Sequence, residues 1–137
     1  MRDSAEVPGG VAEHLRSLCL RLPECVEEAA WVGTRWRVGT RTFAHVVLVD
    51  SGWPPAYARA VGADGPLVVL TFYAPDPDVE ALSSYGPPFF RPPWAPNIMG
   101  VVLDPGTDWD DIAELLVESY RFRAPRRLSS QLEDPEP

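Results

Sequence analysis

Arginines in two separate parts of the chain are the side chains best suited to binding an anionic partner. One group lies around a predicted turn (Arg35, Arg37 and Arg41), and the other lies at the end of the last predicted helix (Arg121, Arg123, Arg126 and Arg127). A guanidinium group offers a planar fork of donors that matches phosphate oxygens. If the two groups meet on one surface, the sequence predicts a site that binds phosphate groups.

A purely structural interpretation of the same arginines also stays open. The last predicted helix carries acidic residues in the run 108–111 at its start and arginines at its end, which is the polarity that its macrodipole favours. Arginines on a hairpin are commonly solvated strand residues with no ligand. In addition, tight DNA binding usually needs roughly 6–10 phosphate contacts. Glu24, Glu27 and Glu28, like the run 108–111, are interpreted as capping and solvated charges.

Aromatic residues form the second candidate site. The proline-rich segment 85–96 contains four of them, and two tryptophans from earlier in the chain are expected nearby: Tyr85, Phe89, Phe90, Trp94, Trp31 and Trp53. A rigid aromatic loop can wall a pocket for a planar ligand or stack on unpaired bases. The alternative, which we favour, is that the rings cap the sheet and fill its core.

Metal binding and catalysis find little support in the sequence. The soft ligands Cys19, Cys25, His14 and His45 show no metal-binding spacing, and the two thiols are expected to be buried and inert rather than joined in a disulfide. Neither Ser83 nor Ser84 lies in a Gly-x-Ser-x-Gly turn, and the glycines form no phosphate-binding loop. We therefore expect no metal, no cofactor and no enzymatic activity.

The first half of the chain positions the first arginine group. Apolar residues spaced three and four apart predict a helix over 11–22, which Pro23 ends. A strand-rich stretch over 29–50 follows, with Gly39 and Thr40 as a two-residue hairpin turn. In that register Val38 faces Arg41 and Arg37 faces Thr42, and one face carries Trp36, Phe43, His45, Val47 and Val49. Arg35 and Arg37 are expected on the other face.

The second half supplies the remaining elements. We expect a helical turn over 56–60, a strand over 67–73, a short helix capped by Asp76 or Asp78, a strand over 98–103 and a final helix capped by Thr107 or Asp108. The buried stripe of that helix is predicted to be Ile112, Leu115, Leu116, Ser119, Tyr120 and Phe122. Short connections indicate an α+β protein of two layers, a mainly antiparallel sheet with helices packed on one face.

Length and charge restrict the function further. The 137 residues suit a single domain over 11–128, with flexible tails at 1–10 and 129–137. The net charge of −8, from 12 basic and 20 acidic residues, opposes undirected attraction to nucleic acid or to anionic lipid. No stretch is long and apolar enough to cross a membrane, and no signal peptide is apparent. We expect a cytoplasmic protein that has no membrane partner and is a monomer in preference to an oligomer.

Several strings in this sequence resemble the MmcQ/YjbR family. They are Leu20-Arg-Leu-Pro-Glu, the hairpin Trp36-Arg-Val-Gly-Thr-Arg-Thr-Phe-Ala44, the acidic helix 109–118 and the ending Ser119-Tyr-Arg-Phe-Arg-Ala-Pro-Arg-Arg-Leu128. The resemblance covers about residues 11 to 128. Arg41 stands where the family usually has lysine, and segment 86–96 differs from the family's usual histidine-containing segment.

The resemblance implies a helix-on-sheet fold of the secretion-chaperone-like type and the family's description as DNA-binding proteins of "double-wing" shape. Our leading interpretation is thus a non-enzymatic protein that binds DNA through the two arginine groups. The alternative is a module that binds a small aromatic ligand or a protein with the loop 85–96.

Overall fold

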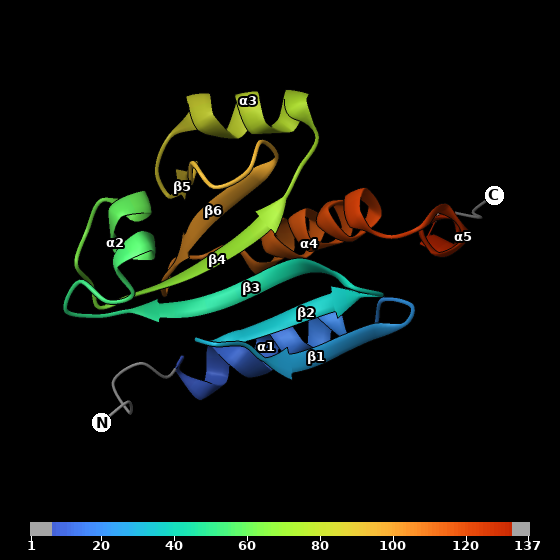
Figure 1. Ribbon diagram of the computed structural model, residues 1–137, viewed down its shortest axis with the longest axis horizontal. Helices are drawn as coiled ribbons and strands as arrows, with labels where there is room; N and C mark the ends of the chain where they lie inside the picture. Colours follow the sequence, from blue (N-terminus) through green and yellow to red (C-terminus); the bar gives the residue numbers. More distant parts are fainter. Residues whose placement is uncertain (1–6, 133–137) are drawn as a thin grey trace.

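Residues 7–132 are described by a computed structural model of the protein (Figure 1). The helices are α1 (Gly9–Cys19), α2 (Pro55–Val61), α3 (Asp76–Tyr85), α4 (Trp109–Arg123) and α5 (Arg126–Ser129). The strands are β1 (Cys25–Ala29), β2 (Thr34–Val38), β3 (Arg41–Val49), β4 (Leu67–Tyr73), β5 (Phe89–Phe90) and β6 (Ile98–Leu103). The predicted order of elements is confirmed, and the structure adds the short β5 and α5.

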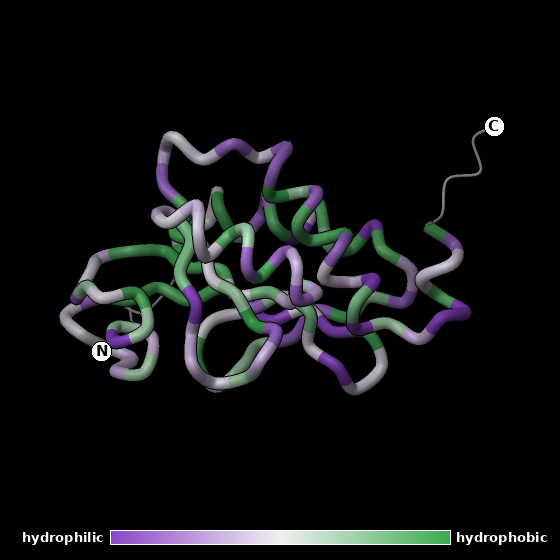
Figure 2. Tube along the Cα trace, turned by 90° about the horizontal axis from the view of Figure 1, so that it is seen from above, coloured by the Kyte–Doolittle hydropathy of each residue, from purple (hydrophilic) through white to green (hydrophobic). Residues whose placement is uncertain are grey.

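The strands form one six-stranded antiparallel sheet in the order β1-β2-β3-β4-β6-β5. This arrangement confirms the α+β class. The hairpin is also confirmed, because Val38 pairs with Arg41 across a turn in which Gly39 has a φ of +61°. In Figure 2, apolar (green) and hydrophilic (purple) stretches follow one another along the chain.

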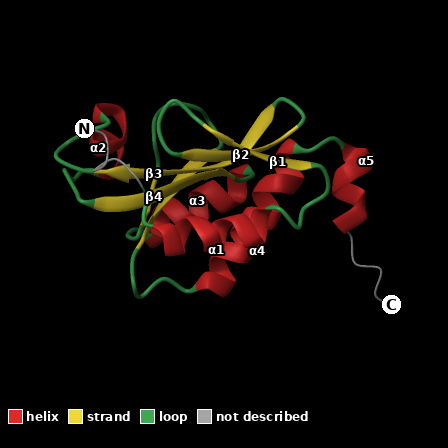
Figure 3. Ribbon diagram, turned by 90° about the horizontal axis from the view of Figure 1, so that it is seen from below, coloured by secondary structure: helices red, strands yellow, loops and turns green. Residues whose placement is uncertain are grey.

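Helices cover the two faces of the sheet unequally. α1, α3 and α4 lie together on one side of the strands (Figure 3), where Leu15, Val79 and Leu116 contribute to the main hydrophobic core. The short α2 packs against the opposite face, where Ala58 contacts a smaller cluster that includes Val69. The main helical layer follows the prediction, and α2 adds a second, partial layer on the other side.

A β-bulge in β3 changes the predicted pairing of the hairpin. Arg37 pairs with Thr42 as expected, but Trp36 pairs with Ala44, so that Phe43 is an extra residue between the two pairs. A bulge sets two residues of one strand against one residue of its partner. Phe43 and Ala44 both belong to the main core with Trp36, which confirms that Trp36 and Phe43 share a face.

Beyond the bulge, the faces of β3 are the reverse of the prediction. Val47 and Val49 belong to the small cluster under α2, and His45 bonds to Tyr57 of that helix. The prediction that put these residues beside Trp36 is therefore wrong, because one extra residue moves every later side chain to the other face. His45 pairs with Arg35 and shares its face.

The buried hydroxyl of Ser119 completes the sheet where the pairing of β3 and β4 stops. The ladder between these strands ends at Ala44 and Phe72. Just beyond it, the Ser119 hydroxyl donates to the carbonyl oxygen of Phe43 (2.6 Å) and accepts from the backbone N–H of Tyr73 (2.8 Å). A side chain of α4 thus satisfies two backbone groups that the strands leave unpaired.

Helix ends follow the sequence in part. The Asp108 carboxylate caps α4 by accepting from the N–H groups two and three residues on (3.0 and 3.4 Å), as predicted. α3 follows Pro75 and has no side-chain cap, so the expected capping by Asp76 or Asp78 is wrong. Phe122 is exposed, and its predicted place in the buried stripe is also wrong, because it lies two residues from the buried Tyr120 and points away from the sheet.

The helices near the two ends of the described chain differ slightly from the predicted ones. α1 begins at Gly9 and ends at Cys19, so it is shifted toward the N-terminus relative to the predicted helix 11–22. After α5, residues Ser130–Leu132 form a 3₁₀ helix. Within the predicted tails, residues 1–6 and 133–137 lie outside the described part of the chain.

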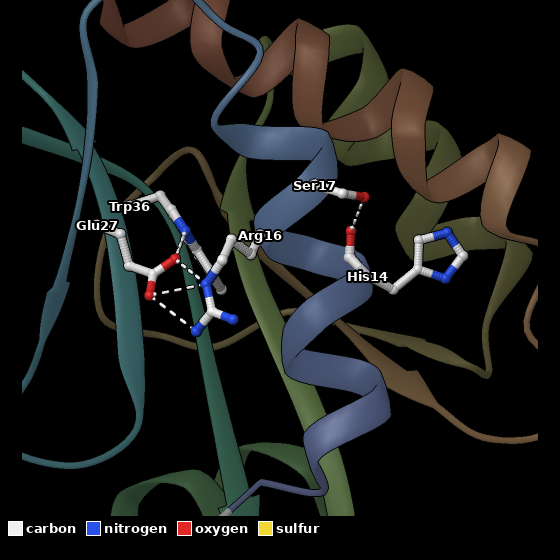
Figure 4. Close-up of polar contacts among 5 residues, drawn as sticks. All are labelled: His14, Arg16, Ser17, Glu27 and Trp36. Atoms are coloured by element: carbon white, nitrogen blue, oxygen red, sulfur yellow. Dashed lines mark hydrogen bonds and ion pairs between the residues drawn. The ribbon is translucent and has the colours of Figure 1, made fainter.

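Glu27 links α1 to the sheet (Figure 4). Its carboxylate accepts bonds from the guanidinium of Arg16 (2.9–3.1 Å) and from the indole Nε1–H of Trp36 (2.9 Å). These bonds, that of Arg16 first, hold the pKa of Glu27 below its ordinary value. On the other side of α1, His14 stacks on Trp109 at 3.9 Å, which joins α1 to α4.

Glu27→Gln is expected to destabilise the protein more at neutral pH than in acid. A carboxyl whose folded pKa is depressed stabilises the fold above its unfolded pKa, and this contribution is lost as the pH falls through the folded pKa. Urea unfolding at about pH 7 and about pH 3 measures the difference between variant and parent at each pH. Glu80→Gln on the exposed surface of α3 is the control, and an equal deficit of Glu27→Gln at both pH values would contradict the prediction.

Candidate functional site

The fold brings most of the two predicted arginine groups to one end of the molecule. Arg123 Nε donates to the carbonyl oxygen of Thr42 (3.0 Å), and the Tyr120 hydroxyl donates to Pro23 O (2.7 Å). The first contact sets the end of α4 against the β2–β3 hairpin, and the second sets it against the turn before β1. Figure 1 shows α5 beyond the same end. We call the guanidinium groups gathered there the arginine end, which comprises Arg37, Arg41, Arg123, Arg126 and Arg127.

Two predicted residues lie beside the arginine end rather than in it. Arg35 is farther along β2 and forms an ion pair with Glu28. Arg121 points to another side of α4, where it pairs with Glu118 (3.8 Å) and donates to Leu132 O (3.0 Å). The site that the structure supports is therefore smaller than the predicted one.

Carboxylates already occupy part of the arginine end. Arg37 Nε lies 3.2 Å from Glu28, and Arg127 makes two bonds of 3.2 Å to Glu24. The bond from Arg127 holds the pKa of Glu24 below its ordinary range. The bonds from Arg35 and then Arg37 do the same for the pKa of Glu28. Glu24 and Glu28, interpreted from the sequence as capping and solvated charges, are ion-pair partners instead.

Arg41 and Arg126 are the arginines most available to a ligand. Both are exposed, and neither forms an ion pair or side-chain hydrogen bond with any residue in the described part of the chain. Arg123 is half-buried, with its guanidinium 4.1 Å from the ring centre of Tyr73. The arginine end thus has more guanidinium groups than carboxylates, in a chain whose net charge is −8.

The predicted aromatic residues do not form one surface. β5 pairs with β6, so Phe89 and Phe90 point to opposite faces of the sheet. Phe89 packs toward the main core and is 5.8 Å from the exposed Tyr85. Phe90 packs with the cluster under α2, where its ring covers Gly100 so closely that a Cβ on that glycine would lie 2.2 Å from the ring.

Three tryptophans lie on the face that carries α2 or at its margin. The ring of Trp31, which is 83% exposed, lies 5.6 Å from that of Trp53, and the ring of Trp94 lies 4.8 Å from Tyr57. Sequence reasoning missed Tyr57, although it lies within the helical turn predicted over 56–60. We call Trp31, Trp53, Tyr57 and Trp94 the aromatic face.

His45 of β3 forms a hydrogen bond with Tyr57 of the aromatic face. Its Nε2 lies 2.7 Å from the carbonyl oxygen of Val32 and its Nδ1 lies 3.0 Å from the Tyr57 hydroxyl. Because a carbonyl only accepts, Nε2 carries the proton and Nδ1 accepts from Tyr57. Burial lowers the pKa of His45 and raises that of Tyr57 to about 12, so both side chains are neutral at pH 7.

The remaining candidate groups are engaged in packing. Cys19 is buried and Cys25 is half-buried, both are free thiols, and burial raises both pKa values, that of Cys25 to about 11. Thiols of this kind are poor nucleophiles. Within residues 7–132 no cluster of three or more His, Cys, Asp or Glu side chains is placed to hold a metal ion.

Comparisons with known proteins give one match. A family model described as YjbR matches residues 20–122, which is most of the chain. No curated protein and no solved structure matches the sequence. Among the described helices, none has the length and apolar character needed to span a membrane.

Proposed function

Because this chain belongs to the YjbR family, we propose that it is a non-enzymatic protein that binds the phosphate backbone of nucleic acid through its arginine end. The observation that carries the proposal is the bond from Arg123 to Thr42 O, which joins the two arginine groups at one end. Elsewhere the acidic surface repels phosphate, so the field of the molecule presents this end to the nucleic acid.

The pairing of the arginines limits how tightly this end binds. Arg41 and Arg126 make the first phosphate contacts. Arg37 and Arg127 bind phosphate only if they break their ion pairs with Glu28 and Glu24. Each phosphate contact on duplex DNA adds about 0.9 to the slope of log affinity against log salt. For two to four contacts we expect a slope between about −1.8 and −3.6, which is smaller in magnitude than that of a protein with an extensive DNA interface.

Reversing the charge of Arg41 and Arg126 together is expected to weaken this binding strongly. We would titrate Arg41→Glu/Arg126→Glu into a labelled duplex of about 20–30 base pairs and into its single strand, and follow fluorescence anisotropy at about 50 and 200 mM salt. The affinity at low salt should fall at least about tenfold. Neither side chain has a described partner, so the fold should be kept.

The control is Arg59→Glu, which makes the same substitution at one exposed position of α2 and half of the total charge change of the double variant. α2 lies at the end of the sheet away from α5 (Figure 1), so this variant should bind as the parent does, apart from the effect of net charge. Equal loss in the control and the double variant would remove the arginine end as the site. Absence of binding by the parent at about 50 mM salt would remove nucleic acid as the partner.

The aromatic face supports a second candidate function, the binding of a small aromatic ligand or of a protein surface. The observation that favours it is the large exposure of Trp31 beside Trp53. Tryptophan emission recorded during the duplex and single-strand titrations distinguishes binding at the arginine end from binding at the aromatic face. Quenching by the single strand that persists in Arg41→Glu/Arg126→Glu would place binding on the aromatic face, where bases can stack.

A further inference from the structure

A groove with an apolar floor lies between α3 and α4, over β5 and β6. Its volume is about 950 Å³, and the arginine end and aromatic face contribute no residue to it. The floor and inner walls are formed by Leu82, Phe89, Val101, Ile112 and Leu115. Tyr85, which is 73% exposed, stands at one wall and contacts Phe89 edge to face. The groove is therefore an apolar surface open to solvent.

Carboxylates surround this floor. They come from α3, from the turn after β6 and from α4: Asp78, Asp104, Asp108, Asp111, Glu114 and Glu118. No arginine or histidine is among the described residues that line the groove. Asp108 is engaged as the helix cap and Glu118 lies near Arg121, but Asp78, Asp111 and Glu114 form no ion pair with any described residue. Uncompensated negative charge therefore lines an apolar surface.

The groove is elongated along the two helices. The lining residues along α4 extend from its N-cap Asp108 to Glu118, a length of about 15 Å at the rise of an α-helix. On α3 the lining runs from Asp78 to Tyr85 with the same helical spacing. A groove of this length matches two to three turns of a helix whose apolar side chains recur at every third and fourth position.

We propose that this groove is the docking site for a basic amphipathic helix of a partner protein. Apolar side chains of that helix pack onto Leu82, Phe89 and Leu115, and its lysines or arginines pair with Asp78, Asp111 and Glu114. Charge complementarity selects this occupant, because the same carboxylates repel the phosphates of a nucleic acid. The site is thus separate from the arginine end and independent of the function proposed for it.

The test uses a labelled model peptide of about 18 residues, made of leucine and lysine with all leucines on one helical face. A second peptide has the same composition in an order that disperses the leucines. We expect saturable binding of the first peptide by fluorescence anisotropy, and at least about tenfold weaker binding of the second. Equal affinity for both peptides, or no binding of the first, would overturn the proposal.

Removing two negative charges from the α4 side of the groove tests whether the carboxylates contribute to peptide binding. Asp111→Asn/Glu114→Gln should weaken binding of the amphipathic peptide about fivefold to tenfold at low salt. The control Glu13→Gln/Glu80→Gln removes the same charge from exposed positions outside the groove and should bind as the parent does. Unchanged affinity in the groove variant, or equal losses in both variants, would contradict the assignment.

Discussion

Replacing Trp36 by alanine should lower the free energy of unfolding by about 3–5 kcal/mol. The Trp36 side chain is fully buried in the middle of the core under α1 and α4, so its removal leaves a cavity that the sheet cannot close. The variant also removes the indole N–H that donates a hydrogen bond to Glu27, so that Arg16 remains the donor to this carboxylate. Chemical denaturation measures the change.

Two further tryptophan variants make the prediction specific. Trp31→Ala is the same substitution at a side chain that is 83% exposed, and it should change the unfolding free energy by less than about 1 kcal/mol. Trp36→Phe keeps a ring in the core and removes the bond to Glu27, so its effect should fall between the two. A loss of similar size in Trp31→Ala and Trp36→Ala would show that burial is not the cause.

Replacing Ser119 by alanine should lower the free energy of unfolding by roughly 2–4 kcal/mol, although only one oxygen atom is removed. The carbonyl of Phe43 and the N–H of Tyr73 would both lose their partner inside the protein, where each unsatisfied group costs about 1–3 kcal/mol. Ser119 has no exposed surface, so bulk water does not reach these groups in its place.

Ser17→Ala is the control for that variant. Its hydroxyl donates to the carbonyl of His14 on the exposed surface of α1, as Figure 4 shows, and water can replace this bond. Alanine also has the higher helix propensity, so the change in stability should stay within about 0.5 kcal/mol. Amide hydrogen exchange gives a local check, because Tyr73 should lose protection in Ser119→Ala. Retained stability and protection would contradict the bridging role.

The fold could largely be predicted because most of its signals are local. The strands 67–73 and 98–103 have the predicted bounds, and the hairpin turn and the cap at Asp108 lie where short patterns placed them. The bulge at Phe43 left no such signal, since the residues around it alternate plausibly in either register. It is stabilised from elsewhere, by packing of Phe43 on Tyr120 and by the Ser119 hydroxyl.

Less of the candidate sites than of the fold could be predicted from the sequence. Their residue types were evident, and the chemistry of arginine toward phosphate follows from type alone. Which arginines are available depends on Glu24 and Glu28, whose partners lie elsewhere in the chain and are set by strand pairing and by the position of α5. The acidic groove had no counterpart in the sequence analysis, because its walls come from α3 and α4 and its floor comes partly from β5 and β6.

The sequence by itself determined the family, the α+β class, most of the order of helices and strands, and the bounds of β4 and β6. Those properties follow from the spacing of apolar residues, turns and caps within short windows of the chain. The tertiary structure alone decided which face His45 occupies, which arginines face solvent, how the aromatic residues divide and where the groove lies. Each of these properties is a contact between segments far apart in the chain, and such contacts depend on packing of the whole sheet against its helices.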